Sequence, residues 1–294
     1  LLSPMVIICC IARRALSNSF GLIWPQVRDH IMQTVDKAMK LLGYFSPSAP
    51  EIGLSELARL ATFDKAATRR FLVALSKHGF IEQNLDSKKY RLGPAFLRFA
   101  RLREATHPFP SMVQPELDRL ATATMETAHA SLINGFELMT IGISEPQRTI
   151  RAHLEPSQPL PMHATASGIA CLAFLDDEAV EGYISQARLE RFTDSTVTSK
   201  KELRRLIGES LKRGYGRAAG TFESDVIGTA VPLFDDAVRP IGAIAVAAVA
   251  SRFDTTIEQQ ILPRLFDAAI RLTLAFGGQM HPTIARAREA FSDK

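Results

Sequence analysis

The chain has 294 residues, which suggests about two domains, and its 46% hydrophobic and 22% charged residues exclude disorder as the state of most of it. Two of its three cysteines, Cys9 and Cys10, are neighbours, which excludes a disulfide framework and indicates a reducing, intracellular location. No apolar run is long enough to predict a membrane span. The net charge of +4 is uneven, because residues 32–107 contain 13 Lys and Arg against 7 Asp and Glu, whereas residues 108–294 contain 19 against 23.

The first 31 residues lack the sequence pattern of a folded segment. Residues 5–12 are apolar but short, and Arg13-Arg14 follows them, whereas a signal peptide places its charge before the apolar run. A clean amphipathic pattern begins only at Met32. We therefore expect residues 1–31 to be disordered or a non-native extension upstream of a start at Met32.

Two helices open the first module. An amphipathic helix is predicted over residues 32–45 from the apolar residues that recur at helical spacing, Val35, Met39, Leu42 and Phe45, with Ala38 and Leu41 beside them. A loop over residues 46–50 follows, and Ser55 is placed to cap a short helix that ends before Thr62.

A third helix, residues 65–78, is predicted between a capping Asp64 and a terminating Gly79. Phe71, Leu72 and Leu75 form its inward stripe, and Lys65, Ala66, Thr68 and Arg69 lie off that stripe near its start. Small residues there allow close approach to a DNA major groove, where Arg and Lys reach guanine acceptors or phosphates. A charged run alone, however, more often marks a solvated helix face. Arg70 borders the stripe, so packing of its stem or pairing with an acid is as open as a DNA contact.

A hairpin is predicted in residues 80–93, with Lys88, Lys89 and Arg91 at and beside its polar tip. Three helices and a basic hairpin form a winged helix-turn-helix, which shifts the balance toward DNA binding for residues 32–93. Ser55 and Thr62 lie where the preceding helix and turn reach phosphates. The predicted DNA contacts are Ser55, Thr62, Lys65, Ala66, Thr68, Arg69, Arg70, Lys88, Lys89 and Arg91.

The rest of the chain predicts a linker, a second module and a tail. Residues 94–110 form a connecting helix and a Pro-containing hinge, residues 111–277 the second module, and residues 278–294 a polar tail expected to be disordered beyond Gly277. Strands are predicted near residues 130–133, 138–144, 149–153, 215–220, 226–234 and 241–250, and helices over residues 111–127, 169–175, 176–186, 200–213 and 255–276. Helices flanking one antiparallel sheet make this module α+β and sensor-like.

Motifs in both modules point to one family. The first module carries VDKAMKLL, LSELARLATFDKAATRRFLVALSKHGFIE and KKYRLGP, and the second carries PMHATASGIACLAFL and RRLIGESLKRGYGRAAGTFESDVIGTAVPLFD. In this order they resemble the IclR family of bacterial transcriptional regulators over residues 32–277. The resemblance implies a winged helix-turn-helix joined by a linker helix to a C-terminal GAF-like effector-binding domain with a central antiparallel sheet, assembled as dimers or dimers of dimers.

The chain departs from that pattern at two places. Ile169 stands where the family usually has Lys, which favours a less anionic effector, and Ala66-Ala67 stands where Ser-Thr is common, which favours an altered operator preference.

The resemblance also implies an effector pocket between the loop 162–167 and the sheet. Gly168, at a predicted helix start, would offer free N–H groups to a carboxylate, so we expect a small organic acid, such as an aromatic one. The alternating Ala and Val of residues 241–250 leave room for a ligand, although they equally allow close helix packing, and Glu223 and Asp225 are equally surface charges. The predicted effector contacts are Met162, Ala164, Thr165, Ala166, Gly168, Glu223, Asp225, Ile227, Ala230, Pro232, Ala245 and Ala247.

Two other functions stay open. A sensor-fold enzyme would use Cys171 or His163, but His163 is more often structural, Cys171 lies in an apolar run, and no hydrolase elbow or metal-binding motif occurs. Alternatively, the second domain only dimerises a DNA-binding protein. We predict no catalytic residue, metal or cofactor, and a cytoplasmic homodimer or homotetramer that binds a double-stranded DNA operator and no membrane, and controls a catabolic operon.

Overall fold

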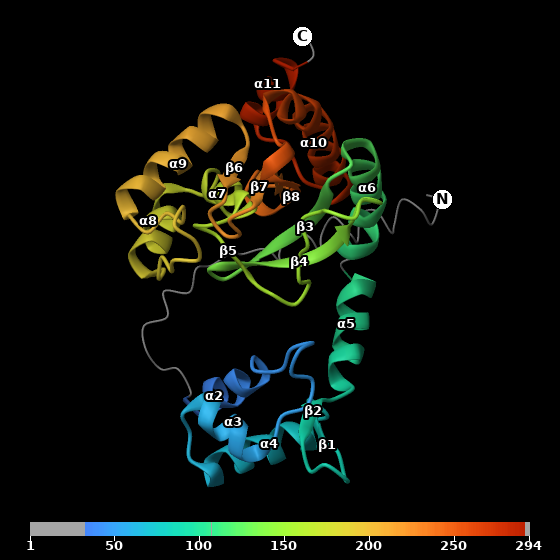
Figure 1. Cartoon of the computed structure of the whole chain (residues 1–294), viewed down its shortest axis with the longest axis vertical. Helices are drawn as coiled ribbons and strands as arrows, with labels where there is room; N and C mark the ends of the chain where they lie inside the picture. Colours follow the sequence, from blue (N-terminus) through green and yellow to red (C-terminus); the bar gives the residue numbers. More distant parts are fainter. Residues whose placement is uncertain (1–32, 107, 292–294) are drawn as a thin grey trace, which may run out of the picture. The chain divides into compact units, whose positions relative to one another are not determined.

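The computed structural model describes residues 33–106 and 108–291, so the expectations for residues 1–31 fall outside the described part. The chain divides into two compact units at the boundary between Pro108 and Phe109, inside the predicted hinge region (Figure 1).

The first unit is a winged helix-turn-helix, as predicted. Its elements are α2 (Gln33–Leu42), α3 (Leu54–Ala61), α4 (Lys65–Lys77), β1 (Ile81–Gln83), β2 (Tyr90–Leu92) and α5 (Ala95–Thr106). The antiparallel register pairs Ile81 with Leu92 and Gln83 with Tyr90, which makes the hairpin. Leu41, Leu57, Leu72 and Ile81 form the centre of the apolar core that holds the helices on this hairpin.

Two details of this unit differ from what the sequence pattern indicates. Val35 and Met39 are each 54% exposed, because α2 packs on the core mainly through its last turn, where Leu41 is fully buried. Ser55 is not a helix cap, because α3 begins one residue earlier, after an extended Gly53 that makes no side-chain capping bond.

The ends of α4 follow the predicted signals. Asp64 accepts a hydrogen bond from the Ala67 backbone N–H at 2.7 Å, which satisfies one of the free N–H groups of the first turn. At the other end, Gly79 has a φ of +74°, a left-handed conformation that residues with a Cβ adopt at a cost.

The second unit contains one six-stranded antiparallel sheet in the order β5-β4-β3-β8-β7-β6. The strands are β3 (Thr127–Asn134), β4 (Glu137–Ser144), β5 (Leu160–Pro161), β6 (Gly216–Ala219), β7 (Val226–Phe234) and β8 (Pro240–Val249). The predicted strand at residues 149–153 is wrong: this segment is irregular and is held beside β3 by the Thr127 hydroxyl, which donates to the Ala152 carbonyl at 2.6 Å.

Helices cover both faces of the sheet (Figure 1). One face carries α6 (Phe109–Thr124) and α10 (Thr255–Ala275), whose side chains pack with Val231 and Val246 of the sheet. The other carries α7 (Ala166–Leu172), α8 (Asp177–Gln186) and α9 (Lys200–Arg213), which pack with Ala230 and Ala243. The helix α7 starts three residues earlier than predicted, because Thr165 caps it by accepting from the Gly168 N–H at 3.1 Å.

The prediction that the chain is disordered beyond Gly277 is wrong for residues 278–291. This segment contains the helix α11 (Pro282–Glu289), which follows α10; a short 3₁₀ turn, η1 (Ala250–Arg252), lies before α10. Ile284 is fully buried in the core beside α10, and Arg288 of α11 lies 2.6 Å from Asp267. No helix in the described part of the chain is both long and apolar enough to cross a membrane.

Candidate DNA-binding face and effector pocket

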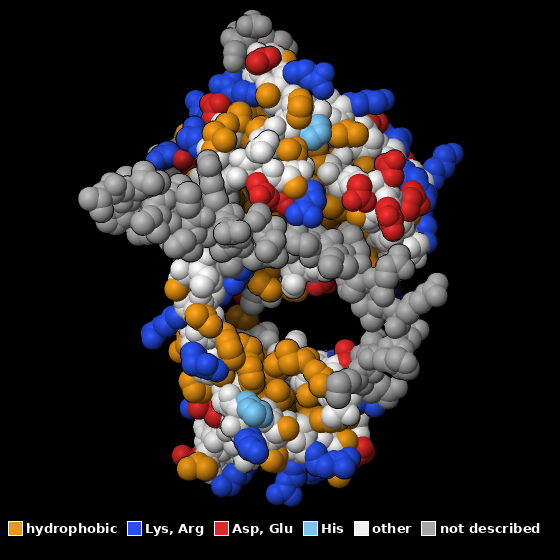
Figure 2. All heavy atoms as spheres, turned by 180° about the vertical axis from the view of Figure 1, so that it is seen from behind, with side chains coloured by type: hydrophobic (Ala, Val, Ile, Leu, Met, Phe, Trp, Pro, Cys, Tyr) orange, Lys and Arg blue, Asp and Glu red, His pale blue; other side chains and the backbone are white. Residues whose placement is uncertain are grey.

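The first two turns of α4 expose a basic surface. Lys65, Ala66, Arg69 and Arg70, which we call the recognition face, are exposed and line an open hollow together with Leu54 and Val73. Within the described residues no ion pair engages either arginine. Figure 2 shows Lys and Arg side chains along the lower edge of this unit. The alternative in which Arg70 packs on the core or pairs with an acid is therefore not what the structure shows.

Thr68 does not belong to this face. It is fully buried, and its hydroxyl donates to the Asp64 carbonyl at 2.9 Å. Helical spacing places Thr68 on the same inward stripe as Leu72 and Leu75, so the predicted DNA contact is wrong.

Ser55 and Thr62 lie at the surface near the recognition face. Ser55 is exposed in the first turn of α3. Thr62 ends α3 in a left-handed conformation, with its N–H bonded to carbonyls of the last turn and its side chain exposed. Phosphate contacts by these two residues stay a prediction.

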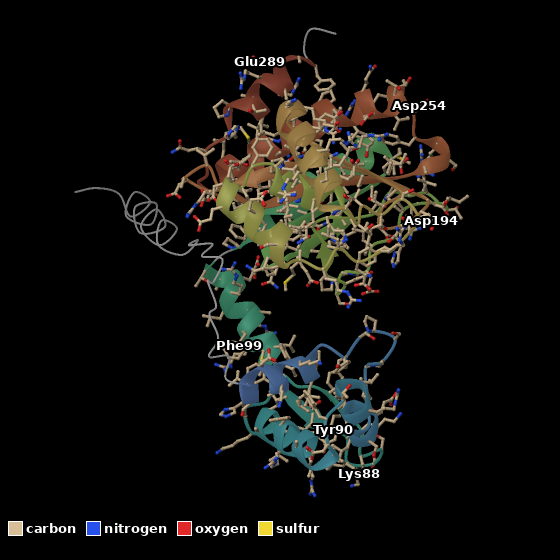
Figure 3. All side chains as sticks on the ribbon, turned by 90° about the vertical axis from the view of Figure 1, so that its left-hand side faces the viewer. Lys88, Tyr90, Phe99, Asp194, Asp254 and Glu289 are labelled. Atoms are coloured by element: carbon tan, nitrogen blue, oxygen red, sulfur yellow. The ribbon has the colours of Figure 1, made fainter. Side chains whose placement is uncertain are left out.

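The tip of the hairpin presents two of its three predicted cations. Lys88 and Lys89 are exposed, and Figure 3 shows Lys88 at the outer edge of the unit with Tyr90 nearer its interior. Arg91 differs, because its guanidinium lies 2.6 Å from Glu82 and 3.5 Å from Glu51. Its side chain is nevertheless half exposed, so a DNA contact by Arg91 would have to compete with these surface ion pairs and stays a prediction.

A hollow of about 630 Å³, open mouth included, lies between α7 and the sheet of the second unit; we call it the β3–β8 pocket. The lining residues come from β3, the segment after β4, the start of α7, the β6–β7 region and β8: His129, Ala152, His153, Leu154, Glu155, Gln158, Leu160, Ala164, Thr165, Ala166, Ser167, Ala218, Thr221, Phe222, Glu223, Val226, Gly228, Ala245 and Ala247.

The structure brings only part of the predicted effector set to this pocket. Ala164, Thr165, Ala166, Glu223, Ala245 and Ala247 line it. Met162 and Ala230 lie in the core between α7 and the sheet, and Pro232 is buried further along β7. Asp225 is exposed outside the pocket. Ile227 is on the wrong face of β7, because side chains alternate and Val226 and Gly228 are the ones that reach the pocket.

Gly168 serves packing instead of ligand binding. A Cβ at this position would lie 2.2 Å from both the Cα and the carbonyl oxygen of Met162, so glycine permits the close approach of α7 to the segment before it. Its N–H is bonded to Thr165. The prediction that this N–H is free for a carboxylate is therefore wrong.

The polar floor of the pocket was missed from sequence. His129 Nε2 lies 3.3 Å from the Ser167 hydroxyl, and His129 Nδ1 has no hydrogen-bond partner within the described residues. Burial lowers the pKa of His129 to about 4, so its imidazole is neutral at physiological pH. The available signal was the alternation of Thr127, His129 and Ser131, which lies mostly before the strand predicted at residues 130–133; in β3 it places three polar side chains on one face.

His163 and Cys171 have structural surroundings. His163 Nε2 lies 2.9 Å from the Glu190 carbonyl and its Nδ1 lies 3.5 Å from the Tyr183 hydroxyl, so it holds the segment after α8 in place. Cys171 is fully buried, and burial raises the pKa of its thiol, which disfavours the thiolate that a nucleophile needs.

Comparisons with known proteins match both units. Residues 34–85 match the IclR helix-turn-helix domain, and residues 106–273 match the bacterial transcriptional regulator IclR C-terminal domain. The chain is 30% identical over 245 residues to the Pca operon regulatory protein of Acinetobacter baylyi, covering 81% of this chain and 87% of that one.

Solved structures of the same fold cover most of the described residues. An IclR-type regulator from Silicibacter sp. TM1040 is 37% identical and superposes with a TM-score of 0.78 over 85% of this chain and 98% of that one. An IclR homologue from Microbacterium hydrocarbonoxydans, solved in complex with 4-hydroxybenzoate, is 23% identical with a TM-score of 0.67, over 87% and 99% of the two chains.

Proposed function

Because the chain belongs to the IclR family of bacterial transcriptional regulators, we propose that it controls a catabolic operon in response to a small organic acid that binds the β3–β8 pocket. The observation that carries this proposal is that one chain combines an exposed cationic recognition face with an open-mouthed hollow that has a polar floor. The first suits DNA and the second suits a small molecule.

On DNA, the recognition face of α4 enters the major groove and Lys88 and Lys89 contact the backbone beside it. Asp64 caps the start of α4, and Ala66 leaves room for the helix to approach the bases. Arg69 and Arg70 then reach guanine acceptors or phosphates, and Ser55 and Thr62 meet phosphates on the flank.

In the pocket, an aromatic or other small acid lies against Ala245 and Ala247, with its polar group on His129 and Ser167. Two facts support an organic acid. The Pca operon regulator is a relative at 30% identity, and a more distant homologue was solved with 4-hydroxybenzoate bound. The hollow and its unpaired imidazole nitrogen favour this sensor over a second unit that only dimerises.

We also propose that the protein acts in the cytoplasm as a homodimer or homotetramer. Leu97 and Leu102 on α5 are 66% and 60% exposed, and exposed leucines on one helix are typical of a protein interface. A two-fold assembly pairs two recognition faces on a palindromic operator.

The test combines DNA binding with ligand binding. DNA upstream of the genes adjacent to this one is footprinted with the full-length protein, with and without hydroxybenzoates and short 2-oxo acids. We expect one protected palindromic region, with an affinity that at least one acid changes. If the DNA is protected but no acid changes the affinity, and no acid raises the melting temperature of the protein, the second unit would be a dimerisation module alone.

A further inference from the structure

The β3–β8 pocket has no fixed positive charge to receive an organic acid. Among the described residues that line it, none is Lys or Arg. Ile169, where the family usually has Lys, is 2% exposed in the apolar core. The titratable residues of the lining are His129 on β3, His153 and Glu155 on the segment after β4, and Glu223 between β6 and β7.

The histidine at the mouth, His153, is already engaged. His153 Nδ1 lies 3.0 Å from Glu145, and Glu145 also lies 2.6 Å from Arg151. Glu145 therefore already binds both Arg151 and His153, although His153 itself lines the pocket. Glu223 is exposed and has no ion pair within the described residues. Partial desolvation raises the pKa of its carboxyl group, against a smaller opposing effect of His153.

The floor of the pocket gives an independent sign of a ligand. His129 Nδ1 is buried without a hydrogen-bond partner among the described residues, although most buried polar groups in proteins are paired. No described charged group perturbs this imidazole, whose pKa is lowered by burial alone. His129 therefore offers a neutral hydrogen-bonding group to a ligand and not a counter-charge.

An anion that enters this pocket meets two carboxyl groups and, among the described lining residues, no fixed cation. Glu155 already accepts a hydrogen bond from the Ser157 hydroxyl at 2.9 Å, which leaves Glu223 as the carboxyl group that faces the anion. Two carboxyl groups held close together in a partly dry site cannot both stay ionised, and they share one proton. We propose, given the organic-acid effector proposed above, that the acid enters the pocket with one proton from solvent, shared between its carboxylate and the carboxyl group of Glu223.

The proposal fixes the pH dependence of binding. At pH values above the pKa of Glu223 and the pKa of the acid, the complex holds one proton more than the free protein and the free acid together. Affinity for the acid therefore falls about tenfold for each pH unit across that range, and levels off at lower pH where Glu223 is already protonated. A neutral analogue needs no shared proton, so its affinity does not change with pH in this way.

The experiment is calorimetry on the full-length protein with hydroxybenzoates, 4-hydroxybenzoate first, and short 2-oxo acids, each beside its amide. Titrations at pH 6, 7 and 8 in two buffers of different ionisation enthalpy count the protons taken up. We expect one proton per acid and none per amide. In Glu223→Gln the uptake and the slope disappear, and at pH 8 the acid binds more tightly than to the wild type. Asp225→Asn, two residues away and outside the pocket, keeps both.

The outcomes separate this inference from the proposed function. An acid that binds with no proton uptake overturns the inference and leaves the effector class standing. Loss of uptake in His129→Gln but not in Glu223→Gln overturns the assignment of the proton to Glu223. If amides bind and no acid does at any pH, or if neither binds, the organic-acid effector itself is wrong and the inference falls with it.

Discussion

The buried stripe of α4 includes a hydroxyl group, that of Thr68. Thr68 donates to the carbonyl of Asp64, one turn earlier, and lies in the core with Leu72. Because the helix rotates about 100° per residue, Arg69 and Arg70 then lie outside this stripe. The adjacent arginines therefore share the exposed side of the helix and do not divide between surface and core.

Arg69→Ala is expected to weaken operator binding by about 1–3 kcal/mol, the range for a side chain that contacts a base edge. Lys77→Ala, at the exposed C-terminal end of the same helix, is the matched control and should have a much smaller effect, because the N-terminal part of a recognition helix enters the groove. Fluorescence anisotropy with labelled operator at fixed salt measures both. Equal losses of affinity in the two variants would mean that α4 contributes only non-specific electrostatic attraction along its whole length.

His129 should make the stability of the second unit fall in mild acid. Its pKa is about 4 in the folded protein against an ordinary value of 6.5, so the unfolded chain binds a proton first as pH falls. The stabilisation is complete above pH 6.5 and is lost by about 1.4 kcal/mol per pH unit down to about pH 4. Urea unfolding at pH 7 and pH 5 tests this. A His129→Gln variant with an undiminished pH dependence would assign the effect to other groups.

At the scale of elements, strong caps made the boundaries predictable. The helix α9 begins and ends as expected, since Ser199 precedes it and Gly214 follows with a φ of +81°. The helix α11 also has signals, a capping His281 and Pro282 at its start, but the polar composition of the tail outweighed them in the prediction. The cap at Thr165 was missed because an irregular stretch precedes it.

The pocket was less predictable than the elements that build it. Ala245 and Ala247 were expected on the correct face because β8 alternates clearly, whereas Ile227 and Gly228 differ only in which side of β7 they face. That choice depends on register with β8, where Gly228 pairs with Ala247. His129 was missed for a similar reason: only tertiary packing places β3 beneath α7, with Ser167 above the imidazole.

The hairpin should supply sequence-independent affinity. Lys88→Ala with Lys89→Ala is expected to lower affinity for operator and random DNA by the same factor, and to flatten the salt dependence by about 0.9 in log–log slope for each phosphate that the variant no longer neutralises. The adjacent exposed pair Lys200 and Lys201, at the start of α9 in the second unit, is the matched control when replaced by alanine. A slope that stays steep in the hairpin variant would contradict the assignment of Lys88 and Lys89 to phosphates.

At the scale of the whole molecule, regulation requires that the pocket and the recognition face influence one another although they lie in different units. A ligand shifts DNA affinity only if it binds two states of the protein with different affinity. Such coupling is reciprocal, so operator DNA must change the affinity for the ligand by the same factor.

This reciprocity gives a quantitative test. We expect the ratio of operator dissociation constants with and without a saturating acid to lie between about 5 and 150, the usual span of such coupling. The ratio of ligand dissociation constants with and without saturating operator should equal it. The Lys88→Ala, Lys89→Ala variant should bind DNA more weakly but keep the same ratio, because its change lies outside the coupling. Unequal ratios in the wild type would show that a change of assembly state intervenes, which sedimentation velocity under the same four conditions would detect.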